Sequence, residues 1–270
     1  MGFWRKSLGC ARLAVLSQLE YRFNLLTDIV VQPAATAAVE IVLWSAIFAS
    51  ATADGSTTLA GITREYYLSY ALWAAFFGRI TASWMYEFRM IEEIESGTVN
   101  SVLARPISFY EYYLGQLMGY KALSTGFSLL VPMAITFFMT SSTDLTRLPL
   151  VLLLTFYALI FVHTVSFAVS SFGFFFNRVR AFTYAKNILL WGLSGELFPL
   201  DLVPEPFRSW VIALPFASFV YVPVGYLTGR LGIEAVGTGF VSLTVGLIVM
   251  GFASSLLWRA GNRRYSGTGA

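Results

Sequence analysis

Apolar segments long enough to cross a lipid bilayer recur along this chain, and they restrict its fold more than any other feature. Of the 270 residues, 57% are hydrophobic and only 12% are charged, whereas a soluble domain carries about 25% charged residues. So little charge cannot coat a water-soluble globule, and a spanning helix needs about 20 apolar residues. The sequence therefore predicts an all-α polytopic membrane protein that forms one transmembrane domain over residues 1–270.

Six segments meet the length requirement. They are residues 29–51, 66–88, 113–139, 149–174, 183–199 and 234–257. Near the start of the third segment, Gly115 and Gly119 have the spacing that lets another helix approach closely. Between the last two segments, residues 200–231 are apolar but interrupted by several prolines, which forbid one straight helix. Broken backbone at membrane depth persists only where protein or water covers it, so we expect a re-entrant pair of short helices there.

The N-terminal residues 1–27 carry charges that interrupt any long apolar core. Their pattern predicts an amphipathic helix on the cytoplasmic surface of the membrane. The residues expected to face lipid are Phe3, Trp4, Leu8, Val15 and Leu19.

The basic residues predict the orientation of the spans. Twelve of the 18 Lys and Arg residues, Lys186 among them, fall in segments that share a side with both termini, and four fall on the other side. Because Lys and Arg are enriched in cytoplasmic loops, both termini and the loop after the second span are predicted to be cytoplasmic.

Three ionisable side chains are predicted to lie inside spans: Glu40, Arg79 and Lys121. A charge at the bilayer centre costs about 2.5–3.5 kcal/mol even on permissive scales, so these groups should face protein or water. A Glu40–Arg79 ion pair is the simplest way to neutralise two of them. The three residues either line a translocation path or lock the packing of the helices, and Lys121 can also snorkel to the cytoplasmic surface.

A charged segment, residues 90–108, separates the second and third predicted spans. It begins with the acidic stretch Glu92, Glu93, Ile94 and Glu95, which Gly97 follows. An apolar edge of Val99, Val102 and Leu103 comes next, and the segment ends with the pair Arg105 and Pro106. Gly97 can end the preceding helix, and Pro106 ends the short helix that follows. A short amphipathic helix at the cytoplasmic end of a helix bundle can bind a cytosolic partner, so we expect this segment to be a docking site.

The sequence contains no motif for catalysis or for ATP binding. It lacks a G-x-x-x-x-G-K-[ST] phosphate loop, an H-E-x-x-H pair and a G-x-S-x-G elbow. Its single cysteine, Cys10, excludes a multi-cysteine metal site. We therefore expect no catalytic residue, no metal and no cofactor bound by this chain, and ATP with Mg²⁺ on another polypeptide if ATP drives it.

Two motifs resemble those of ABC-2 type permease subunits of ABC transporters, in particular a six-span bacterial branch related to viologen and drug exporters. The first, after the second predicted span, is Glu93-Ile94, Gly97, Leu103 and Arg105-Pro106. The other motif is similar to the family's extracellular re-entrant region and includes Gly195, Pro199, Pro204, Pro215-Phe216 and Pro223.

The resemblance implies a multi-pass permease of the bacterial cytoplasmic membrane that exports a hydrophobic or amphipathic substrate. It implies two cytosolic ABC ATPase subunits, a second permease copy or paralogue, and no nucleic-acid partner. Residues 90–108 would hold the coupling helix and residues 1–27 the connecting helix, and Glu40 and Arg79 would lie on spans that line the route. The alternative is a carrier or channel that works alone, with Glu40, Arg79 and Lys121 as its ion path.

Overall fold

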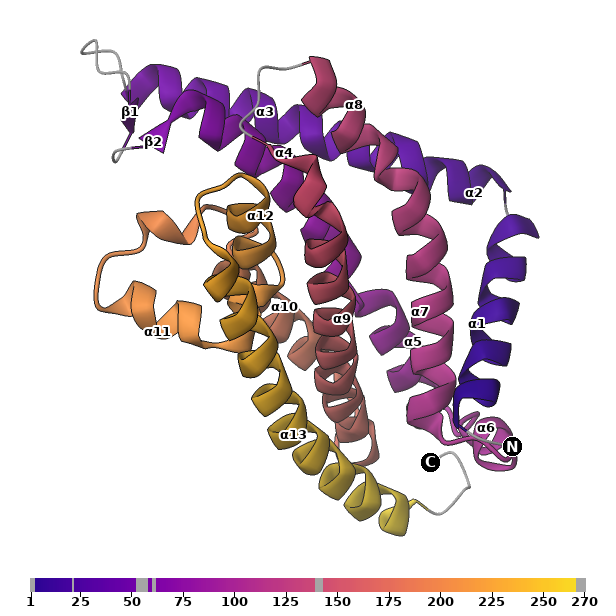
Figure 1. The fold of residues 1–270 in the computed structure, drawn as a ribbon. Helices are drawn as coiled ribbons and strands as arrows, with labels where there is room; N and C mark the ends of the chain where they lie inside the picture. Colours follow the sequence, from indigo (N-terminus) through magenta and orange to yellow (C-terminus); the bar gives the residue numbers. More distant parts are fainter. Residues whose placement is uncertain (1–2, 21, 52–57, 60–61, 139–142, 266–270) are drawn as a thin grey trace.

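The protein is a bundle of helices (Figure 1). Its structure is a computed structural model, which describes residues 3–20, 22–51, 58–59, 62–138 and 143–265. Within these ranges the strands are β1 (Thr58–Leu59) and β2 (Ile62–Thr63), which pair antiparallel just before helix α4 (Arg64–Thr81). The predicted all-α class is confirmed.

Four helical stretches of the described chain are long and apolar enough to cross a membrane: Thr27–Ser50, Phe109–Phe138, Leu145–Phe174 and Ile233–Arg264. They correspond to the first, third, fourth and sixth predicted spans. Their main helices are α3 (Gln32–Ala51), α7 (Phe109–Ser128) with α8 (Leu130–Phe138), α9 (Leu148–Ser171) and α13 (Ile233–Arg264). The fifth predicted span is the shorter helix α10 (Arg180–Ser194). Length and composition thus support four of the six crossings, and the other two stay predictions.

The second predicted span is broken in the middle. Helix α4 ends at Thr81, Ala82 is extended, and a new helix, α5 (Trp84–Glu95), begins after Ser83. The polar residues beside the break find partners: the Thr81 hydroxyl bonds carbonyls of its own helix, and the Ser83 hydroxyl lies 3.0 Å from that of Ser166 on α9. Two cavities adjoin Ala82 at this break.

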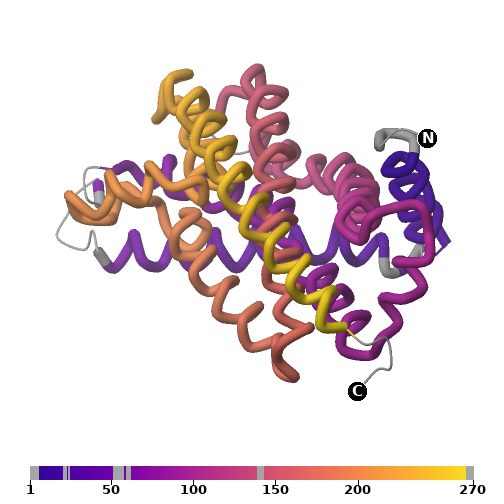
Figure 2. Tube along the Cα trace, turned by 90° about the horizontal axis from the view of Figure 1, so that it is seen from below, coloured from indigo at the N-terminus to yellow at the C-terminus, as the bar shows by residue number. Residues whose placement is uncertain are grey.

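Helix α9 lies in the middle of the bundle, packed against α13 on one side and α5 on the other (Figure 1). Its buried face meets α4, whose Trp73 and Phe77 are fully buried. Helix α3 takes a different direction: it crosses the bundle at the end opposite the short helix α6 (Asn100–Leu103), where it packs on α4 (Figures 1 and 2).

The proline-rich stretch forms short helices, as its composition predicts. They are α11 (Phe207–Ala213) and α12 (Tyr221–Leu227), with single turns at Leu200–Leu202 and Pro215–Ser218. Helix α12 is buried against α9, α13 and α4, whereas α11 exposes Phe207 and Trp210. Entry of this pair into the bilayer from one side stays a prediction.

Helix α1 (Phe3–Glu20) runs along α7 (Figures 1 and 2). Gly115 and Gly119 make this approach possible, because a Cβ atom at Gly119 would overlap the carbonyl oxygen of Ala11, and one at Gly115 would lie 2.7 Å from that of Ser7. The close helix approach predicted for the two glycines is confirmed. Helix α1 packs on a membrane-length helix and leaves Leu8 exposed, and its place at the membrane surface stays a prediction.

A side chain at Gly119 should separate α1 from α7. We expect Gly119→Ala to destabilise the protein by about 1–3 kcal/mol, the range for overpacking, because the backbone of Ala11 cannot move aside locally. Gly126→Ala is the matched control on the same helix, since its Cβ would meet nothing within 4 Å, and we expect it to be neutral or stabilising by up to about 1 kcal/mol. Thermal unfolding in detergent measures both, and equal melting temperatures would contradict the α1–α7 contact.

Candidate functional site

The loop between α5 and α7 has the local structure that its residue order predicts. Gly97 follows the end of α5 with φ +78°, a left-handed conformation that favours glycine. Helix α6 then forms a single turn and ends before Pro106. Ser108 and Glu111 start α7 with a capping box, in which each side chain accepts from the other residue's backbone amide.

The inner face of this loop is anchored in the bundle. Val99 and Val102 are buried in a cluster with Phe109 and Tyr113 of α7 and Met90 of α5. The end of α13 also holds the loop, since the hydroxyl of Tyr265 donates a hydrogen bond to the carbonyl of Gly97 at 3.0 Å. The loop is therefore fixed to three helices of the bundle.

The outer face of the loop is smaller than the sequence suggests. Of the apolar edge predicted for a partner, Val102 is 2% exposed and Leu103 is 39% exposed, so Val99 and Val102 belong to the core instead. Ile94 is buried, and Glu92 is exposed, 3.9 Å from Arg180 of α10. Glu93 is partly buried. The surface that remains for a partner includes the run from Leu103 to Pro106, together with Asn100 and Ser101 of α6, which are also exposed.

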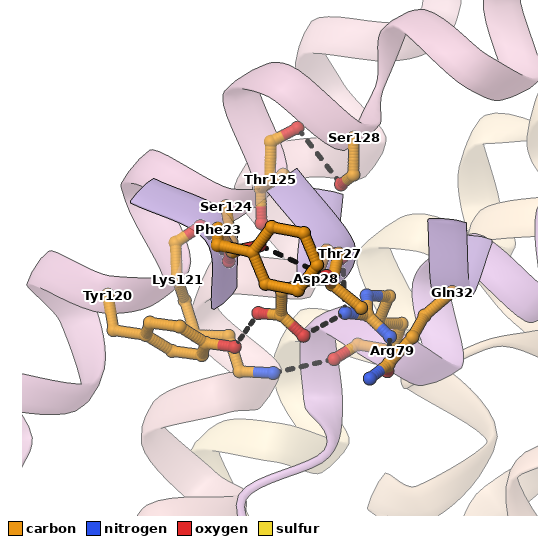
Figure 3. A network of polar contacts seen from close by, with 10 residues as sticks. All are labelled: Phe23, Thr27, Asp28, Gln32, Arg79, Tyr120, Lys121, Ser124, Thr125 and Ser128. Carbon is orange, nitrogen blue, oxygen red and sulfur yellow. Dashed lines mark hydrogen bonds and ion pairs between the residues drawn. The ribbon is translucent and has the colours of Figure 1, made fainter. Parts of the chain in front are cut away.

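A polar cavity of about 190 Å³ lies beside the break between α4 and α5. Polar side chains from three segments line it (Figure 3): Asp28 and Gln32, Arg79, and Tyr120, Lys121, Ser124, Thr125 and Ser128. Arg79 forms an ion pair with Asp28 and donates to Gln32 Oε1 at 2.8 Å. The hydroxyl of Tyr120 donates to the other Asp28 oxygen.

The predicted Glu40–Arg79 pair is wrong, because Asp28 is the partner of Arg79. Asp28 lies in the π-helical turn η1 (Thr27–Val31), which continues directly into α3 and so begins the membrane-length stretch. Glu40 is twelve residues further on, about 18 Å along a helix, where it is half-buried beside Trp44. Snorkelling of Lys121 is also wrong: this side chain is buried and donates to the carbonyl of Arg79 at 2.6 Å.

A second buried ion pair, which the sequence did not predict, joins α5 to α10. Glu87 and Lys186 form it, with exposed side-chain fractions of 0% and 9%. Lys186 also donates to the hydroxyl of Ser166 on α9 at 3.1 Å. Lys186 was counted among the charges of the cytoplasmic segments, and the structure shows that its side chain is buried in an ion pair. The signal was present, since Glu87 falls inside the predicted span 66–88 and Lys186 inside the predicted span 183–199.

The residues of the second motif lie around α9 and α4. Gly195 has φ +83°, and its carbonyl accepts a hydrogen bond from Tyr70 of α4 at 2.7 Å. A Cβ there would lie 3.0 Å from Tyr221, which explains the glycine. Phe216 packs on Phe161 of α9. The prolines take several positions: Pro199 and Pro223 are buried, Pro215 begins a single turn and Pro204 is exposed.

A comparison with known protein families gives a match that covers both motifs. The sequence model of one family, described as an ABC-2 family transporter protein, matches residues 34–269. This range includes the loop with α6, Arg79, Lys121 and the proline-rich stretch, whereas Asp28 precedes it. No curated protein matched the chain in a sequence search.

Proposed function

Because the chain belongs to the ABC-2 family of transporter proteins, we propose that it is the permease of an exporter driven by two separate ABC ATPase subunits. Membership confirms the family resemblance drawn from the two motifs. A permease of this family is a membrane component that works with ABC ATPase subunits and is not itself the ATPase. Outward transport, the number of ATPases and the substrate class belong to the proposal.

The anchored loop with α6 is the observation that carries the proposal. A segment that transmits a conformational change from an ATPase to the permease must be exposed to the ATPase on one face and packed against the bundle on the other. Leu103, Arg105 and Pro106 provide the exposed face, and Val102 packs into the cluster with α5 and α7. A partner that displaces α6 therefore displaces both helices, and α5 and α7 both reach the polar cavity.

The remaining parts of the proposal concern the assembly. ATP and Mg²⁺ bind to the partner ATPases, and a second permease copy or paralogue completes the route for a hydrophobic or amphipathic substrate. The beginning of α1 and the end of α13 lie at the same end of the bundle as α6 (Figure 1). This arrangement supports placing both termini on the same side of the membrane as α6; that this side is the cytoplasm, and the membrane a bacterial cytoplasmic membrane, is part of the proposal.

The test replaces the exposed leucine of the loop. We expect Leu103→Asp to weaken co-purification with the ABC ATPase, and transport-coupled ATP hydrolysis, by about tenfold or more, the size of an interface hot spot. Unfolding stability should change by only about 0.5 kcal/mol, because Leu103 is outside the core.

Val102→Asp is the comparison, since the same charge one residue earlier enters the buried cluster and should destabilise the fold. Normal ATPase binding and coupling by Leu103→Asp would remove α6 from this role. Transport by the reconstituted chain without any ATPase or ATP would instead support a carrier or channel that works alone.

A further inference from the structure

One face of α7 carries a polar stripe. Lys121, Ser124, Thr125 and Ser128 are spaced i, i+3, i+4 and i+7, which places them on the same side of a helix. All four line the polar cavity (Figure 3). The stripe lies within Phe109–Phe138, a stretch apolar enough to cross a membrane. Polar residues in such a stretch are expensive unless they serve a ligand or a neighbouring helix.

Lys121 is the charge of this cavity that has no carboxylate bound to it in the described part of the chain. Its side chain is 6% exposed, and its ammonium group donates to the neutral carbonyl of Arg79. The carboxylate of Asp28 forms its ion pair with Arg79 and not with Lys121. Glu196 lines the adjoining cavity, which shares Ala82 and Trp84 with the first, and no ion pair joins it to Lys121 among the described residues.

The hydroxyl groups of the stripe are held weakly. Ser124 donates to the carbonyl of Lys121, and Ser128 to that of Thr125, both at a long 3.4 Å. Such bonds are easily exchanged for a stronger acceptor. An ammonium group has three donors, so Lys121 and the hydroxyls together present several donors to the cavity and attract an anion.

We propose that this cavity binds the anionic headgroup, a phosphate-class oxyanion, of an amphipathic substrate. The proposal rests on the export function and names its substrate class. The cavity volume of about 190 Å³ far exceeds the ~10–15 Å³ that one water molecule needs. Trp84 and Met85 line the same cavity and are about half exposed, at 44% and 50%, so they provide an apolar exit for the tail.

The test measures binding of simple amphiphiles to the full-length chain in nanodiscs of zwitterionic lipid. The probes are dodecyl phosphate and dodecyltrimethylammonium, which share a tail and differ in charge, and affinity follows from the rise in melting temperature. We expect the phosphate to bind at least about tenfold more tightly, the size of one charge-assisted hydrogen bond. Lys121→Met should abolish this preference, and Lys6→Met, which removes the same charge outside the cavity, should keep it.

Two further measurements distinguish a lipid-like headgroup from a free anion and keep the test valid if Lys121→Met does not fold. Competition by inorganic phosphate indicates a free oxyanion site, and its failure to compete indicates a headgroup that needs its tail. If Lys121→Met does not fold, Ser124→Ala and Thr125→Val should each weaken dodecyl phosphate binding severalfold. Equal binding of the two amphiphiles, or unchanged affinity in the variants, overturns the proposal. Because binding needs no ATPase, that result leaves the coupling role of α6 untouched.

Discussion

Replacing Lys186 by Met should destabilise the protein by about 3–5 kcal/mol, the loss typical of a buried ion pair from which one partner is removed. The reason is the completely buried carboxylate of Glu87, which then lacks a counter-charge. The hydroxyl of Ser166 lies 3.1 Å from the lysine nitrogen and cannot supply a positive charge in its place. Chemical unfolding in detergent gives the free energy.

The double variant separates loss of the pair from loss of packing. Glu87→Gln together with Lys186→Met removes both charges, and we expect it to recover most of the stability, because replacement of a whole buried pair is often nearly neutral. Glu92→Gln is the matched control, since Glu92 and Arg180 join the same two helices, α5 and α10, through an exposed contact. It should change stability by no more than about 1 kcal/mol. Losses that simply add in the double variant would show that the two charges do not interact.

The loop with α6 shows which structural features can be predicted from neighbouring residues alone. Gly97 and Pro106 act on the backbone of their own neighbourhood, so a helix break and a helix end could be predicted from residue type alone. Which side of the short helix meets the bundle depends on α5 and α7. For that reason the predicted apolar edge was assigned to a partner, although Val102 packs inward and Leu103 outward.

Long-range pairing of charges could not be predicted with the same success. The prediction paired Glu40 with Arg79 because both were assigned to spans, and it left Asp28 at the edge of the amphipathic segment. The π-helical turn at Thr27–Val31 brings Asp28 into the cavity instead. By contrast, the stripe from Lys121 to Ser128 is a local helical pattern that was visible in the sequence. The cavity that it faces appears only when η1, α4 and α7 meet.

The two candidate partners of Arg79 can be distinguished by a pair of double-mutant cycles. Asp28→Asn and Arg79→Met should each destabilise the protein by about 1.5–3 kcal/mol, the value of a hydrogen bond to a charged group. Their effects should be strongly non-additive, with a coupling free energy of about 1 kcal/mol or more, because each removes the same contact. Both side chains remain about one fifth exposed, at 24% and 22%, so the coupling should stay below that of the fully buried pair.

Glu40→Gln provides the second cycle with Arg79→Met. Glu40 lies on α3 beside Trp44 and outside the cavity, so its effect should add to that of Arg79→Met within about 0.5 kcal/mol. Coupling of Arg79 to Glu40 rather than to Asp28 would contradict the position of η1 and with it the shape of the polar cavity. Coupling to Asp28 alone would leave Lys121 without a directly bound carboxylate among the described residues, which is the arrangement on which the proposed anion site depends.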